Sequence, residues 1–107
     1  MIAVIFEVTP APEQSDRYFE LAAGLREKLE TIDGFISIER FQSLADENKF
    51  LSLSFWRDQD AIDAWYQVPA HGNAQNEGRR GVFQDYRIRV AEVFRDYDMA
   101  QGRPATD

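Results

Sequence analysis

The sequence contains no cysteine among its 107 residues. Disulfides, thiolate metal sites and cysteine nucleophiles are therefore excluded, and the chain suits a reducing compartment. It has a single histidine, His71, so no two histidines stand at a metal-binding spacing. Glycine-rich nucleotide loops and the GxSxG and HExxH motifs are absent as well. His71 is left as the one side chain that titrates near neutral pH.

Basic residues are also scarce. Twelve Lys and Arg stand against 19 Asp and Glu, which gives a net charge of −7. Binding to a phosphate backbone depends on cationic side chains, so we expect no nucleic-acid partner. A local anion site stays open, because half of the basic residues gather in the C-terminal part, at Arg79, Arg80, Arg87, Arg89, Arg95 and Arg103.

Long apolar runs are missing. No stretch approaches the roughly 20 apolar residues that a helix needs to cross a bilayer. The opening residues, MIAVIFEVTP, lack a basic leading region and contain Glu7, so they are typical of a strand rather than a signal peptide. The expectation is a soluble, cytoplasmic protein without a membrane partner.

Large apolar side chains, by contrast, are plentiful. The composition is 44% hydrophobic and 13% aromatic, which is too rich for a disordered chain. The length fits one domain with a real but modest core. We expect this domain over residues 1–97 and a loose tail over residues 98–107.

The first half of the chain predicts a strand, a helix and a hairpin. Residues 2–8 are β-branched and aromatic, as in a covered strand. A helix should begin at Ser15, as N-cap, and stop at Asp33-Gly34, with one apolar face made of Phe19, Ala22, Leu25, Leu29 and Ile32. Residues 35–44 and 49–56 have strand composition and are joined by the turn residues 46–48, which favours a β-hairpin.

The second half predicts a short helix and a last strand. Asp58 or Asp60 can cap a helix whose apolar face holds Ala61, Ile62 and Trp65. Residues 70–81 are polar and contain three glycines, which indicates a loop or a frayed helical turn. In residues 82–97 the apolar positions change parity after Val90, which suggests a bulge or a strand buried on both sides.

The resulting order, β-α-β-β-α-β, is the split βαβ arrangement of an α+β, ferredoxin-like sandwich. Two helices would cover one face of an antiparallel sheet. The other face would still carry apolar residues, from the pairs Phe6 or Ile5, Phe41 or Ile38, and Phe55 or Trp56. An apolar patch of this kind usually marks a partner, so we expect two copies to pack sheet to sheet as a homodimer.

Several of these features resemble the antibiotic biosynthesis monooxygenase family of dimeric α/β barrels, over residues 1–97. They are the strand end Phe55-Trp56, the helix carrying Trp65, the segment from His71 through Ala74-Gln75 to Gly78-Arg79, and the last strand YRIRVAEV. The resemblance implies a homodimer and a monooxygenase that needs no metal or other cofactor. Its substrate would be a small aromatic or quinol, bound between sheet and helices, that can itself give an electron to O₂.

That resemblance also assigns roles to residues. His71 would be the general base that deprotonates the substrate hydroxyl. Trp65, Phe6 and Phe55 would bind the flat ring, and Arg79 would stabilise a phenolate or a superoxide. Other readings stay open: His71 could fix the turn after Pro69 by a side-chain hydrogen bond or contact the dimer mate, Trp65 could be core alone, and Arg79 plain surface charge.

The family includes a haem-degrading branch, which uses an Asn on the first strand, a Trp on the second helix and a His about ten residues after that Trp. Trp65 matches this pattern, but the first-strand position falls near Phe6 and the later one at Gln75. These departures argue against haem. A dimer that binds a small molecule without chemistry remains the alternative to an enzyme.

Overall fold

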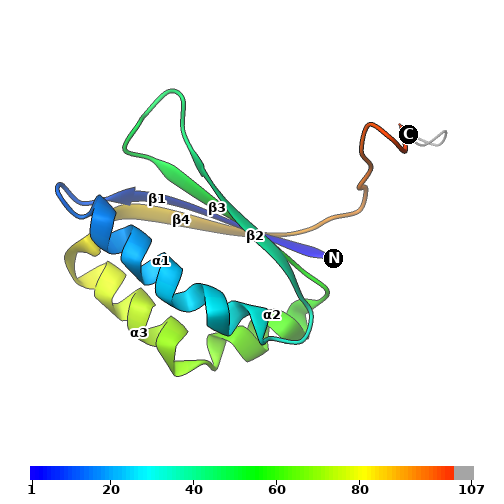
Figure 1. Cartoon of the computed structure of the whole chain (residues 1–107), viewed down its shortest axis with the longest axis horizontal. Helices are drawn as coiled ribbons and strands as arrows, with labels where there is room; N and C mark the ends of the chain where they lie inside the picture. The colour runs from blue at the N-terminus through cyan, green and yellow to red at the C-terminus, as the bar shows by residue number, and fades with distance from the viewer. Residues whose placement is uncertain (103–107) are drawn as a thin grey trace.

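The computed structural model describes residues 1–102, and the last five residues of the expected tail lie outside that range. Its elements follow in the order β1 (Ile2–Pro10), α1 (Ser15–Glu30), β2 (Phe35–Gln42), β3 (Phe50–Trp56), α2 (Gln59–Tyr66), α3 (Pro69–Glu77), η1 (Gly78–Val82) and β4 (Phe83–Glu92). The four strands form one sheet in the order β2-β3-β1-β4. Figure 1 shows α1, α2 and α3 on the same side of this sheet.

All three strand pairs are antiparallel, and β1 lies between β3 and β4. This is the strand order of a ferredoxin-like fold, so the α+β prediction from the sequence is confirmed. The predicted hairpin is confirmed too, since β2 pairs with β3. Its turn is closed by Asp46, whose carboxylate accepts a hydrogen bond from the Asn48 amide at 3.0 Å.

Helix α1 differs from the prediction at its first turn. Gln14 is the N-cap and makes no side-chain cap bond, so Ser15 is already the first helical residue. The buried face is also rotated by one residue there. Tyr18 is 4% exposed while Phe19 is 40% exposed, although Ala22 and Leu29 are buried as expected. Periodicity could not separate two adjacent aromatics. Both rings pack on Phe50 of β3, but only Tyr18 also packs on Phe83 of β4.

Helix α2 has the predicted cap and the predicted face. Asp58 Oδ1 accepts a hydrogen bond from the Ala61 amide at 3.0 Å, which satisfies one free N–H group of the first turn. Ala61, Ile62 and Trp65 are buried. Asp58 is thus the cap, and Asp60 lies within the first turn.

The segment expected to be a loop or a frayed turn is a regular helix, α3. Pro69 stands in its first turn, where the missing N–H costs nothing. The glycine-containing end then forms η1, in which Gly81 has a φ of 138° that only glycine adopts easily. Of the three glycines, Gly78 and Gly81 therefore follow the end of the helix, while Gly72 lies within it.

The last strand needs no bulge at its parity change. Val90 pairs with Val4 and Ala91 with Ala3, in unbroken register. The register shift lies at the other end of β4, opposite Thr9 and Pro10. Val93 follows the strand and donates its amide to the Met1 carbonyl at 2.9 Å.

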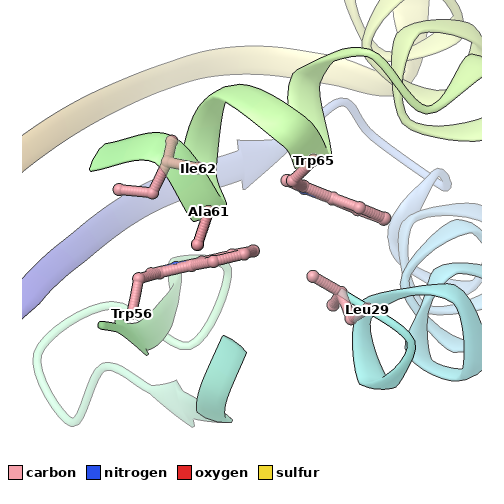
Figure 2. Packing of buried hydrophobic residues seen from close by; sticks show 5 residues of the cluster. All are labelled: Leu29, Trp56, Ala61, Ile62 and Trp65. Atoms are coloured by element: carbon pink, nitrogen blue, oxygen red, sulfur yellow. The ribbon is translucent and has the colours of Figure 1, made fainter. Parts of the chain in front are cut away.

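The core lies between the sheet and the helices, in two clusters. In the larger one, the rings of Trp56 from β3 and Trp65 from α2 reach into one interior space beside Leu29 from α1, as Figure 2 shows. The smaller one joins Val8, Tyr18 and Val82. None of the helices in residues 1–102 is long and apolar enough to span a membrane.

Strand alternation settles which residues face the helices. Phe6, Ile38 and Trp56 lie on the helix side, where they line a cavity. Their alternatives Ile5, Phe41 and Phe55 lie on the opposite side, which we call the open face. Ile5 pairs with Leu53 there, Ala3 with Phe55 and Phe41 with Leu51. Residues 1–102 place no helix over this face (Figure 1).

Candidate functional site

A cavity of about 180 Å³ lies between the sheet and the three helices. Its floor comes from all four strands and its roof from α1, α2 and α3. The walls are mainly apolar and aromatic, and they include Val4, Phe6, Leu21, Leu25, Ile38, Trp56, Ile62, Trp65, Phe83 and Ile88. An apolar cavity of roughly 150 Å³ can hold benzene, so this space suits one ring with a few substituents.

Trp65 reaches the cavity from the buried face of α2. It is only 6% exposed and packs in the cluster with Leu29 and Trp56. Figure 2 shows its ring pointing away from the axis of α2, toward Leu29 of α1. It also lines the cavity. The two readings of the sequence are therefore combined, because Trp65 is both core and cavity wall.

His71 lies in the first turn of α3 and also lines the cavity. Its ring stacks on Tyr66 at a centroid distance of 5.2 Å and an interplanar angle of 14°, and it lies 4.7 Å from the ring of Trp65. Burial lowers the pKa of His71, so the imidazole is neutral near pH 7. A neutral imidazole can accept a proton, which is what a general base must do.

The Nδ1 atom of His71 is buried and has no hydrogen-bond partner in residues 1–102. The structural alternative, a side-chain bond that fixes the turn after Pro69, is not made through this atom. The turn is instead held by the backbone, through the His71 amide and the Val68 carbonyl at 3.1 Å. The contacts recorded for the imidazole within residues 1–102 are those with the rings of Tyr66 and Trp65.

Two other polar atoms, Tyr18 Oη and Arg40 Nε, are also buried and have no hydrogen-bond partner within residues 1–102. All three side chains line the same cavity. Buried polar groups are nearly always hydrogen-bonded, because an unmade bond costs roughly 1–3 kcal/mol. Three such atoms around one apolar space point to a ligand that supplies the missing partners.

Arg79 and Phe6 line the cavity as the sequence suggested, but Phe55 does not. Arg79 is exposed and donates to Asn76 Oδ1 at 2.6 Å. Phe6 packs against Phe83 and Tyr86, at 5.8 and 5.9 Å between ring centroids. Phe55 points to the open face because it is one residue out of step with Ser54 and Trp56. The structure therefore separates Phe55 from the rest of the candidate site.

Sequence reasoning missed Tyr18, Arg40 and the two serines of β3. Ser52 and Ser54 are 7% and 6% exposed and line the cavity, and Ser54 Oγ accepts a hydrogen bond from Trp56 Nε1 at 2.9 Å. The sequence signal for a cavity here was the alternation of small serines with bulky leucines along this strand. A small residue on the covered side of a strand leaves room for a cavity.

Residues 1–102 contain no cluster of three or more His, Cys, Asp or Glu side chains that could hold a metal ion. The two positions that differ from the haem-degrading pattern do reach the cavity, but as the phenyl ring of Phe6 and the amide of Gln75. The pattern needs an asparagine amide on the first strand and an imidazole ten residues after the tryptophan. The cavity has an amide at the second position, Gln75, and its imidazole, His71, at a different one. This donor set does not fit a haem site of that kind.

Sequence comparison identifies the group to which this architecture belongs. The sequence profile described as antibiotic biosynthesis monooxygenase matches residues 1–77. The chain belongs to the antibiotic biosynthesis monooxygenase family. A protein of Pyricularia oryzae named jasmonate monooxygenase is 47% identical over 93 residues, which cover 87% of this chain and 43% of the fungal protein. The chain thus spans less than half the length of that relative.

Solved structures share the fold of this chain. Rv0793 from Mycobacterium tuberculosis superposes with a TM-score of 0.81 at 16% identity, covering 91% of this chain and 98% of that one. A candidate antibiotic biosynthesis monooxygenase from Deinococcus radiodurans gives 0.81 at 15% identity, with 92% and 98% covered. At such identities the likeness concerns the fold.

Proposed function

We propose that this protein is a monooxygenase that acts on a small aromatic or quinol substrate without a resident metal or organic cofactor. One observation carries the proposal. A neutral, half-buried imidazole with an unpartnered Nδ1 atom lines an apolar cavity sized for one ring. Membership of the family and the 47% identity to a named monooxygenase support the reaction class.

In the proposed reaction the substrate supplies all the electrons. His71 takes the proton of the ring hydroxyl, and the phenolate passes one electron to O₂. The radical pair combines to a peroxide on the ring carbon, and the O–O bond then breaks. One oxygen stays on the ring as a quinone carbonyl and the other leaves as water, so phenol plus O₂ gives quinone plus water. Arg79 would stabilise the phenolate or superoxide charge.

The walls would contribute by excluding water and aligning the ring. Trp65 and Phe6 present aromatic faces to the cavity, and such faces favour offset or edge contacts with a flat ligand. A dry, apolar environment strengthens the electrostatic interactions made inside it. The same walls would equally suit a dimer that only binds a small molecule, which is the competing function.

We also propose that the working unit is a homodimer packed through the open face. The open face carries Ile5, Leu53 and Phe55, with Phe41 44% exposed at its edge. A patch of this kind on a single copy favours association. Twofold packing of two identical faces is the commonest arrangement for such surfaces.

The test measures oxygen uptake with a hydroquinone substrate added first without and then with O₂. We expect uptake in the wild type and a fall of about 10²-fold or more in His71→Ala, the usual range for a lost general base. The jasmonate named for the fungal relative is a second candidate substrate, on the strength of the sequence identity. That arm needs an added two-electron reductant, because jasmonate carries no electron-rich phenol.

Glu27→Gln is the matched control, since Glu27 is exposed on α1 outside the cavity. Equal turnover in wild type and His71→Ala would remove His71 from the mechanism. Ligand binding without uptake in any arm would favour the non-catalytic dimer. A Soret band on titration with haem would reopen the haem reading.

A further inference from the structure

The cavity differs in charge from the rest of the molecule. The whole chain has 19 Asp and Glu against 12 Lys and Arg. Yet none of the residues lining the cavity is acidic, while the two arginines Arg40 and Arg79 both line it. An apolar space that gathers cationic groups and excludes carboxylates, inside an acidic protein, is complementary to an anion.

Arg40 is the most unusual of these groups. Several other arginines have acidic partners: Arg57 pairs with Asp33 and Asp58, and Arg17 pairs with Glu20 and Glu77. Arg40 is half-buried, its Nε atom is fully buried, and its side chain forms no hydrogen bond or ion pair within residues 1–102. A buried donor without a partner is costly, so the Nε atom in the cavity wall calls for an acceptor, and the positive charge of the guanidinium favours an anionic one.

We propose that the ligand of this cavity carries a carboxylate, and that Arg40 binds it. The proposal rests on the cavity assigned above to a small aromatic substrate and narrows it to an aromatic acid. A guanidinium presents its donors in a planar fork that matches the two oxygens of a carboxylate. Arg40 is a specificity-determining residue in this scheme and has no part in the chemical step.

The sheet register supplies a second donor beside Arg40. Arg40 on β2 pairs with Ser52 on β3, and Ser52 pairs with Phe6 on β1, all on the helix side. Tyr18, with its unpartnered hydroxyl, packs on Phe50, which lies two residues before Ser52. A carboxylate near Arg40 would therefore find hydroxyl groups at the same end of the cavity.

His71 belongs to a different end. Its ring stacks on Tyr66 and lies tilted against Trp65, both of α2, and Trp65 packs with Leu29 and Trp56 of the larger cluster. The cavity thus has an anion end at Arg40 and a base end at His71. A single ring with a carboxylate on one side and a hydroxyl on the other fits this arrangement.

The experiment compares gentisate (2,5-dihydroxybenzoate) with its methyl ester and with hydroquinone, by titration calorimetry without O₂. All three keep the quinol ring, and only gentisate carries the carboxylate. A hydrogen bond to a charged group is worth enough to predict at least about tenfold tighter binding of gentisate. Arg40→Gln should remove this preference, Arg40→Lys should keep part of it, and Arg26→Gln on the exposed surface of α1 should leave it unchanged.

Equal affinity of the acid and the ester in the wild type would overturn the proposal, as would failure of both to bind. This comparison does not depend on whether an Arg40 variant folds. Competition by inorganic phosphate as strong as that by gentisate would also overturn it, because the site would then be a general anion site. Oxygen uptake distinguishes this proposal from the proposed monooxygenase function. Uptake together with equal binding of acid and ester would support the oxygenase but not the carboxylate site. Tighter binding of the acid without uptake would support the carboxylate site but not the oxygenase.

Discussion

The two faces of the sheet treat polar groups in opposite ways. On the open face Glu7 bonds both Arg89, at 3.3 Å, and Lys49, at 3.5 Å. On the helix face Tyr18 Oη, Arg40 Nε and His71 Nδ1 are buried without partners. Charged side chains on the open face thus pair with each other, whereas these three polar atoms on the helix side have no partner within residues 1–102.

This difference separates two roles that one sheet performs. Alternating side chains allow each strand to serve both, because residues one step apart never share a face. Ser52 and Ser54 leave space on the covered side, while Leu51, Leu53 and Phe55 fill the other. The helix side, where the serines leave a cavity, carries the candidate site. The open face, which is filled by larger apolar side chains, is the proposed dimer surface.

The largest expected effect concerns the packing of the helix face. Trp65→Ala should lower the free energy of unfolding by about 3–5 kcal/mol, because it removes a large buried ring from the main cluster. Urea unfolding followed by circular dichroism measures this. The neighbouring Tyr66→Ala, at a side chain that is 44% exposed, should cost much less. Equal losses would show that Trp65 is cavity wall and not core.

The next effect concerns the open face. Leu53→Glu places a charge in the middle of the proposed dimer surface, and desolvating an unpaired charge there is unfavourable. Light scattering after gel filtration should give twice the chain mass for the wild type and one chain mass for the variant. The surface change Glu27→Lys on α1 serves as the control. A wild type of one chain mass, or a variant that stays dimeric, would contradict the proposed packing.

The smallest effect is the pH dependence that follows from His71. Burial lowers the pKa of this group below its ordinary 6.5, so the unfolded chain takes up a proton first as the pH falls. The stability contributed by neutral His71 should be full above about pH 6.5 and should be lost as the pH falls through the folded pKa.

Because the chain has one histidine, a single imidazole NMR signal reports this titration. Its midpoint should lie below 6.5, and His71→Gln should flatten the stability profile between pH 7 and 5. A midpoint at or above 6.5 would mean that the imidazole is solvated or paired with an acid. The base end of the cavity would then need a different explanation.

The sequence was a good guide to the fold because strand alternation, helix periodicity and caps are local signals. Asp58 and the buried face of α2 could be read from neighbouring residues alone. Errors arose where contacts between distant elements decided the outcome. Tyr18 takes the core position expected of Phe19. Both rings contact Phe50, but Tyr18 also packs on Phe83 of β4, and no local pattern carries that information.

The candidate site was predicted less completely for the same reason. His71, Trp65, Phe6 and Arg79 were found because their residue types stand out, and the structure brings all four to one cavity. Phe55 was misplaced because alternation fixes the two sides of a strand but not which side the helices cover. Arg40 escaped notice because its lack of a partner is a property of its surroundings and not of the sequence.

One glycine sets the size of the cavity from outside it. A Cβ atom at Gly78 would collide with the ring of Phe83, and Phe83 is itself a cavity wall. Adding a methyl group at this position would therefore press that ring inward, toward Phe6 and Tyr18. The absence of a side chain at residue 78 thus leaves Phe83 room to sit back from the cavity, although residue 78 itself does not line it.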